Sequence, residues 1–421
     1  MYEKSVLSSG VRVVTSRMDH VRSVTIILYY AVGSRYESDD QAGITHFIEH
    51  MLFKGTRRRP DPIQITEEIE GVGGIINAST GRESTDYWVK IPSAHLERAF
   101  DVLADMVRDS AFTPGEIAKE RGVIVEEIRG IADTPDDLIH DIIDEVVWDG
   151  QPVGRPVIGT EETVGALTRE RLVSYWQEHY QPERLVIAAA GDLHHQHFVE
   201  LAERAFGDLR QSAAASFTPA TVSQQAPRVR AIARDTNEAH VCVAMPALPY
   251  TDDRRFTQDT IDTLLGAGMS SRLFREIRER RGLAYDVYSY FRTYADVGQG
   301  VVYLGTDPAR VDQAVRAVLA ELLALRDRPV GEDELTRAKE LRKGRILMGL
   351  EDSRAVAGWI GSQELVYGQV FTPEELIERI DAVTTGDVGA LAAELFRPER
   401  LNAVLIGPNA DDDHLRSLLD L

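Results

Sequence analysis

The feature that most constrains the fold is a tetrapeptide that occurs once in each half of the chain. Pro182-Glu-Arg-Leu185 opens a predicted strand followed by a helix, and Pro398-Glu-Arg-Leu401 does the same near the other end. Self-similarity over a long interval indicates two copies of one structural unit. We therefore expect the chain to contain a duplicated domain.

Other segments follow the same order in both halves. The corresponding predicted elements are residues 85–91 with 300–305, 94–108 with 308–326, and 24–32 with 240–249. Two copies of one α+β domain explain the length of the chain without long structureless loops. Each copy is predicted to be a mostly antiparallel sheet with helices packed on one face.

A polar segment separates the two predicted copies. Residues 211–227 are rich in small and polar side chains and contain proline, which is typical of a linker. We predict an N-terminal domain over residues 1–210 and a C-terminal domain over residues 228–421.

The composition favours a reducing, cytoplasmic setting. No apolar run approaches the length of a bilayer span, so we expect no membrane partner. The first residues lack the apolar core of a secretory signal. Cys242 is the single cysteine, which excludes an internal disulfide framework. Its place in an apolar, strand-like run favours a buried and inert thiol.

The formal net charge of −21 argues against a nucleic-acid partner, because nucleic-acid binding needs a cationic surface. Two interpretations of the charge stay open. The first is a solvated acidic surface that aids solubility. The second is an acidic enclosure that concentrates basic peptides.

His46, Glu49 and His50 form an H-x-x-E-H pattern in a stretch that favours a helix. Positions i, i+3 and i+4 of a helix share one face, so the two imidazoles can grip one metal ion beside a carboxylate. Zinc suits imidazole and carboxylate ligands, and its catalytic sites keep one position open for water. This pattern is the inverzincin signature.

A second predicted helix, over residues 113–131, offers a third ligand. Glu120 and Glu127 are two helical turns apart and fall on one face. Glu126 is rotated away from that face by roughly 100°. Glu127 is therefore the better ligand of the adjacent pair, and Glu120 becomes a neighbour that can hydrogen-bond a ligand or the metal-bound water.

These stretches resemble those of the pitrilysin, insulin-degrading enzyme and mitochondrial processing peptidase family of zinc metallopeptidases. The resemblance implies one zinc ion per chain. It assigns His46, His50 and Glu127 as zinc ligands, Glu49 as the general base and Glu120 as the supporting carboxylate.

The second half lacks an H-x-x-E-H pattern but contains Arg278 and Tyr285, which match an arginine and tyrosine in the non-metal domain of the family. There, the pair reaches across a chamber to substrate near the zinc. Arginine can clamp a peptide carbonyl, and a tyrosine hydroxyl can donate to a developing oxyanion. Since two domains correspond to the short family form, the resemblance implies a homodimer that closes the chamber.

The predicted function is that of a zinc-dependent endopeptidase that hydrolyses extended peptides or presequences in a chamber formed by two subunits. By resemblance, the segment Asn77-Ala-Ser-Thr80 forms the sheet edge along which substrate binds, with Asn77, Ala78 and Ser79 as the substrate-binding residues. The alternative is a non-catalytic peptide-binding or structural subunit of the same family. Such relatives typically lose the H-x-x-E-H residues, which this chain keeps.

Overall fold

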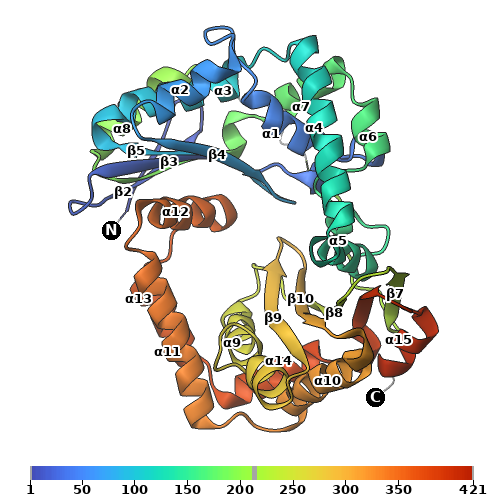
Figure 1. Cartoon of the computed structure of the whole chain (residues 1–421). Helices are drawn as coiled ribbons and strands as arrows, with labels where there is room; N and C mark the ends of the chain where they lie inside the picture. Colours follow the sequence, from blue (N-terminus) through green and yellow to red (C-terminus); the bar gives the residue numbers. More distant parts are fainter. Residues whose placement is uncertain (1, 211–215, 420–421) are drawn as a thin grey trace. The chain divides into compact units, whose positions relative to one another are not determined.

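The computed structural model describes residues 2–210 and 216–419. These residues form two compact units, each assembled from three segments of the chain (Figure 1). Unit 1 comprises residues 1–129, 155–218 and 347–372, and unit 2 comprises residues 130–154, 219–346 and 373–421. None of the helices in the described residues has the length and apolarity that a membrane span requires.

The described part of unit 1 contains a six-stranded sheet in the order β1-β2-β6-β3-β5-β4. Neighbouring strands run antiparallel, except that β2 and β6 are parallel. The strands are β1 (Glu3–Val6), β2 (Arg12–Arg17), β3 (Ser23–Tyr30), β4 (Ile75–Thr80), β5 (Thr85–Pro92) and β6 (Leu185–Gly191). Strand β4 therefore lies at one edge of the sheet, and its described ladder partner is β5.

Helices of unit 1 pack on one face of this sheet (Figure 1). Val24, Ile26 and Leu28 of β3 alternate toward that face and are fully buried. Each such side chain contributes about 1.5–3 kcal/mol through burial. The helices of unit 1, apart from α12, are α1 (Ile44–Leu52), α2 (Pro62–Glu70), α3 (Leu96–Asp109), most of α4 (Pro114–Asp133), α6 (Glu161–Ala166), α7 (Arg169–His179) and α8 (His195–Phe206).

Helix α12 (Ser353–Tyr367) covers the opposite face of the same sheet (Figure 1). Its Val356, Ala357 and Ile360 pack with Ile27 of β3 and Ala188 of β6 in one buried cluster. The helix approaches closely because it presents a glycine at position 361. A Cβ atom there would meet the Tyr29 ring at 2.6 Å.

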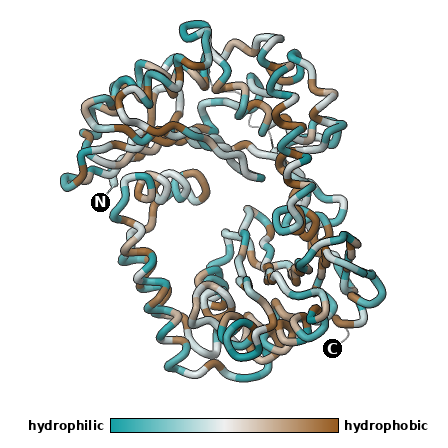
Figure 2. The backbone as a smooth tube through the Cα atoms, viewed as in Figure 1, coloured by the Kyte–Doolittle hydropathy of each residue, from teal (hydrophilic) through white to brown (hydrophobic). Residues whose placement is uncertain are grey.

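The described part of unit 2 contains a five-stranded sheet in the order β7-β11-β8-β10-β9. The strands are β7 (Arg228–Ala233), β8 (Ala239–Ala247), β9 (Ala284–Thr293), β10 (Gly298–Thr306) and β11 (Asn402–Gly407). The helices, apart from α5, are α9 (Arg255–Leu265), α10 (Val311–Asp327), most of α11 (Glu332–Gly349), α13 (Pro373–Ala382), α14 (Thr385–Leu395) and α15 (Asp412–Leu419). Figure 2 shows brown, apolar stretches along the strands and helices of each unit.

Helix α5 (Pro135–Val147) packs on the second sheet, against β8 and β11. Ile139 and Ile143 of α5 are fully buried in a cluster with Val404 and Ile406 of β11. Each sheet thus has one helix that comes from a distant part of the sequence.

The duplicated domain is confirmed by matching sheet topology. Strands β6 and β11 each follow a short 3-10 turn, Pro182–Arg184 and Pro398–Arg400 respectively. Each of these strands lies between one parallel and one antiparallel neighbour. The predicted α+β class with mostly antiparallel sheets is therefore correct.

The compact units do not follow the predicted domains of residues 1–210 and 228–421. Helix α5 belongs to unit 2 and α12 to unit 1, because each buries its apolar face on the sheet of the other half. Part of the predicted linker, residues 211–215, lies outside the described residues. Residues 216–227 contain no helix or strand.

One stretch of unit 1 forms two helices in place of one long helix. Residues 161–179 are divided into α6 and α7. The Thr168 side chain accepts a hydrogen bond from the backbone N–H of Arg171 and so begins a new helix. Strand β1 was not predicted, because its sequence Glu-Lys-Ser-Val has no apolar alternation.

Candidate metal centre

Helix α1 carries the H-x-x-E-H residues on its less buried face. Phe47, Ile48, Met51 and Leu52 are fully buried on the core side. His46, Glu49 and His50 are half-buried on the other side. The apolar residues thus fix the helix in the core and leave the three polar side chains facing one site.

Helix α4 brings two glutamates to this site. Glu120 is buried, whereas the side chain of Glu127 is 45% exposed. Glu126 points elsewhere: it is 72% exposed and pairs with Arg129. This is the rotation expected for adjacent residues of a helix.

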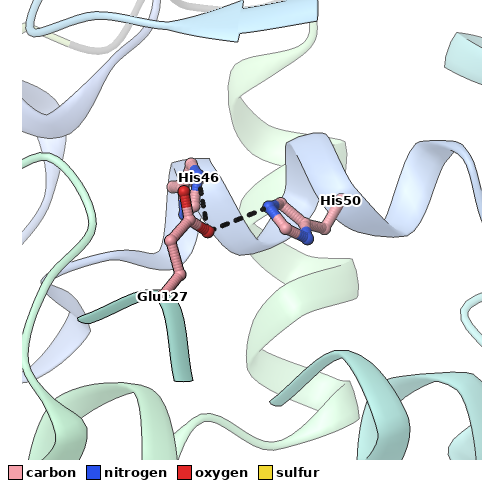
Figure 3. A group of neighbouring side chains, drawn as sticks. All are labelled: His46, His50 and Glu127. Atoms are coloured by element: carbon pink, nitrogen blue, oxygen red, sulfur yellow. Dashed lines mark ion pairs between the residues drawn. The ribbon is translucent and has the colours of Figure 1, made fainter. Parts of the chain in front are cut away.

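His46, His50 and Glu127 form a cluster, which we call the metal cluster (Figure 3). Glu127 Oε2 lies 3.7 Å from His50 Nε2 and 4.0 Å from His46 Nε2. One donor atom from each of the three side chains lies within 4.8 Å of the others. Donors of a tetrahedral zinc site are separated by about 3.4 Å, which is close to the two separations between Glu127 and the histidines. The donor set therefore fits zinc.

Glu120 orients one of the two imidazoles. Its Oε2 atom lies 3.1 Å from His50 Nδ1, and its Oε1 atom lies 3.0 Å from Lys54 Nζ. A carboxylate that accepts from Nδ1–H fixes the tautomer in which Nε2 is free to bind metal. Lys54 compensates the charge of this buried carboxylate.

His46 is prepared for metal binding by burial. Burial, and then the neighbouring His50, lower the pKa of His46 to about 4. Its ring is therefore neutral near pH 7, which is the form that binds a metal. Its Nδ1 atom is buried and has no hydrogen-bond partner among the described residues.

Glu49 lies beside the metal cluster and accepts a hydrogen bond from the Thr80 hydroxyl. Burial is the main cause that raises its pKa, and the Thr80 hydrogen bond opposes this shift. A carboxylate with a raised pKa beside a metal site is suited to take up and release a proton. The hydroxyls of Tyr87 and Tyr180 lie 2.8 Å apart; burial is the main cause that raises the pKa of each, and the charge of Glu49 adds to it.

The expected substrate-binding residues lie on the edge strand β4. Asn77 and Ser79 are exposed and Ala78 is half-buried, as expected of alternating side chains. Ile75 on the same strand is 58% exposed. The strand thus has a free edge and exposed side chains in the described part of the chain.

Arg278 and Tyr285 lie together in unit 2. Arg278 lies in a π-helical segment, Phe274–Arg280, and Tyr285 lies in strand β9. The turn between them requires a left-handed residue, which is Gly282 with φ of 59°. The guanidinium carbon of Arg278 lies 4.7 Å from the centre of the Tyr285 ring. Tyr285 is 79% exposed, so its hydroxyl is available to a ligand.

The histidines at the start of α8 do not form a metal site. Both ring nitrogens of His195 lie 2.8 Å from a hydroxyl, one from Ser5 and one from Thr15. His197 instead pairs with Glu97. These side chains connect the helix to its neighbours.

Sequence reasoning missed two residues that support the site. The sequence predicts Thr80 only as the end of the edge segment, and no role is predicted for Lys54. The position of Lys54, one helical turn after His50, was a usable signal. No signal in the sequence pointed to Thr80, because its partner Glu49 belongs to a different element of the fold.

Two family models match the chain. The family described as "Insulinase (Peptidase family M16)" matches residues 12–161, which include the metal cluster. The family described as "Peptidase M16 inactive domain" matches residues 166–342, which lack an H-x-x-E-H pattern.

Two bacterial relatives are similar over nearly the whole chain. A protein of Streptomyces coelicolor, called an uncharacterized zinc protease, is 39% identical over 414 residues, covering 97% of this chain and 90% of the relative. A Bacillus subtilis protein with the same description is 34% identical over 413 residues, covering 98% and 99%.

Solved structures share the fold. A protease from Helicobacter pylori superposes with a TM-score of 0.92 at 22% identity, covering 97% of this chain and 99% of the other. An M16 inactive-domain protein from Pseudomonas fluorescens gives 0.90 at 19% identity, covering 97% and 98%.

Two histidines of an H-x-x-E-H helix that meet a glutamate of a second helix are typical of the inverzincin class of metallopeptidases. Within that class, the chain belongs to the M16 peptidase family.

Proposed function

We propose that the protein is a zinc-dependent endopeptidase. The observation that carries the proposal is the meeting of His46, His50 and Glu127 from two separate helices, with Glu49 beside them. Structural zinc sites have four protein ligands, whereas three donors leave one position open for water. A neighbouring carboxylate with a raised pKa supplies the proton acceptor that hydrolysis also needs.

The proposed mechanism assigns one task to each residue. His46, His50 and Glu127 would hold one zinc ion, which supplies Lewis acidity and lowers the pKa of a water. Glu49 accepts a proton from the attacking water and passes it to the departing amine. Thr80 holds the Glu49 carboxylate in place through its hydroxyl.

The substrate is proposed to be an extended peptide that pairs with the free edge of β4. Backbone hydrogen bonds to an edge strand give affinity without requiring a particular sequence. Asn77, Ala78 and Ser79 would be the contact segment. An extended strand is available in unfolded peptides or presequences rather than in folded proteins.

We further propose a homodimer in which Arg278 and Tyr285 of one subunit serve the zinc of the other. Tyr285 would donate a hydrogen bond to the developing oxyanion, and Arg278 would bind a substrate carbonyl or carboxylate. The exposure of Tyr285 and its contact with Arg278 support this role.

The net charge of −21 supports basic peptides as favoured substrates. Matched peptides of opposite charge, cleaved at low and high salt, test this point: equal rates contradict it.

The single buried thiol of Cys242 suits a cytoplasmic location.

The decisive experiment combines elemental analysis with cleavage of a quenched fluorescent peptide. The purified protein is expected to contain one zinc per chain and to lose cleavage with a chelator. Zinc without any cleavage would favour the non-catalytic, peptide-binding alternative. Cleavage that is unaffected by removal of all metal would refute the proposal.

A further inference from the structure

Helix α1 begins without a capping side chain of its own. Its N-cap residue is Gly43, with φ of 90°, in the left-handed region that favours glycine. A Cβ atom at this position would lie 2.5 Å from the carbonyl oxygen of Ile158. The serine, threonine or aspartate that usually caps a helix therefore does not fit here.

Glu37, six residues upstream, takes over this task. Its Oε2 atom accepts a hydrogen bond of 2.8 Å from the N–H of Gly43, and its Oε1 atom accepts one of 2.9 Å from the N–H of Thr45. N–H groups at the beginning of a helix have no acceptor within the helix, and they lie at its positive end, where a negative charge is favoured. His46, the first residue of the metal cluster, follows Thr45 directly.

The Glu37 carboxylate is buried, and in the described residues it forms no ion pair with a lysine or arginine. Arg155 instead donates to the backbone oxygen of Glu37 at 3.0 Å and pairs with Asp39 at 3.1 Å. The segment that carries Glu37 is thus anchored, while its carboxylate is directed at the helix. Burying a carboxylate away from water is costly, and the two backbone hydrogen bonds from α1 offset part of that cost.

The position of α1 decides whether the metal cluster can form. His46 and His50 are on one helix, but Glu127 comes from another, α4. Near the end of α1, the contacts from Glu120 to Lys54 and His50 tie it to α4. At its beginning, the Glu37 carboxylate holds the backbone.

We propose that Glu37 is a positioning residue of the metal centre, which fixes the first turn of α1 so that His46 meets Glu127. The proposal rests on the metal centre of the proposed function. It goes beyond that function by assigning a role to a residue outside the H-x-x-E-H pattern.

The test compares zinc affinity in two variants that each neutralise a buried carboxylate of unit 1. Glu37→Gln keeps the size of the side chain but replaces one acceptor oxygen with an amide that repels a backbone N–H. The matched control is Glu364→Gln, because Glu364 is fully buried and pairs with Lys4 and Arg12 instead of α1. Zinc affinity is measured by competition with a chromophoric chelator, and Tm is measured for both variants.

Glu37→Gln is expected to bind zinc about 10-fold more weakly than the wild type, as when other partners of metal-site residues are removed. Glu364→Gln is expected to lose stability and to keep wild-type zinc affinity. Glu37→Asp is a second variant that keeps the charge but is too short to reach both N–H groups, and it too is expected to weaken zinc binding.

Wild-type zinc affinity in both Glu37 variants would overturn the proposal, as would an equal loss in Glu364→Gln. The readout is separate from peptide cleavage. If the wild type binds zinc but cleaves no peptide, the proposed function fails while the test of Glu37 remains valid.

Discussion

The imidazole of His50, on α1, lies between two glutamates that both belong to α4. Its Nδ1 atom is 3.1 Å from Glu120 Oε2, and its Nε2 atom is 3.7 Å from Glu127 Oε2. The two glutamates are two turns apart on α4, so one helix supplies both a metal donor and the acceptor that orients another donor. Substitution of the half-exposed Glu127 removes a metal donor, whereas substitution of the buried Glu120 removes the group that orients His50.

Glu120→Gln is expected to weaken zinc binding without abolishing it. The amide can still accept from His50, but the charge that pairs with Lys54 is lost. Loss of such an outer partner typically costs about 10–100-fold in metal affinity. Competition with a chelator measures the effect. Glu126→Gln is the matched control, because Glu126 is on the same helix but is exposed, and an equal loss in this control would contradict the assignment.

Glu49→Gln is expected to keep zinc and lose turnover. The glutamine retains an oxygen for the Thr80 hydroxyl but cannot accept the proton of the attacking water. General-base removal costs about 10²–10⁴-fold in rate. The measurements are kcat on a quenched peptide and zinc content of the same sample. Wild-type hydrolysis by this variant would exclude Glu49 as the base.

Mixing Glu49→Gln with Tyr285→Phe is expected to restore part of the activity that each variant lacks. Under the proposed sharing, a mixed dimer contains one zinc site with an intact base that is served by an intact tyrosine. The recovered rate should rise as subunits exchange, which is monitored by labelled chains. Exchange without recovery would contradict sharing between subunits.

The free energy of unfolding is expected to fall as the pH is lowered from about 6.5 toward 4, partly because of His179. Burial, and then Arg184, lower the pKa of His179 to about 4 in the folded chain. The unfolded chain, with its ordinary histidine pKa, binds a proton in this window and the folded chain does not, so acid favours unfolding.

His179→Phe tests the contribution of this histidine. Phenylalanine keeps a ring against Tyr175, on which His179 stacks with ring centres 3.9 Å apart. The difference in Tm between about pH 7.5 and about pH 5 should be smaller in the variant than in the wild type. The same difference in both would show that His179 does not contribute.

The duplicated fold could be predicted because its signals are local and occur twice. The Pro-Glu-Arg-Leu segments become matching turns and strands, β6 and β11. The exchange of α5 and α12 could not be predicted in this way. An amphipathic helix shows that it needs an apolar surface, but its sequence does not specify which of two similar sheets supplies it.

The metal cluster could be anticipated because helical spacing places His46 and His50 together and separates Glu126 from Glu127. The support around it was hidden, because it depends on contacts between elements. Glu37 reaches the beginning of α1 from the segment that precedes it, and Thr80 reaches Glu49 from a strand. Side-chain periodicity gives no information about such contacts.

The exchanged helices make the two halves of the polypeptide dependent on each other for folding. A fragment that ends after β6 and α8 leaves the α12-covered face of its sheet, including Ile27 and Ala188, open to water. The complementary fragment lacks α5 and exposes Val404 and Ile406. Separately produced halves should therefore aggregate, whereas co-produced halves should assemble into a nicked but native-like protein.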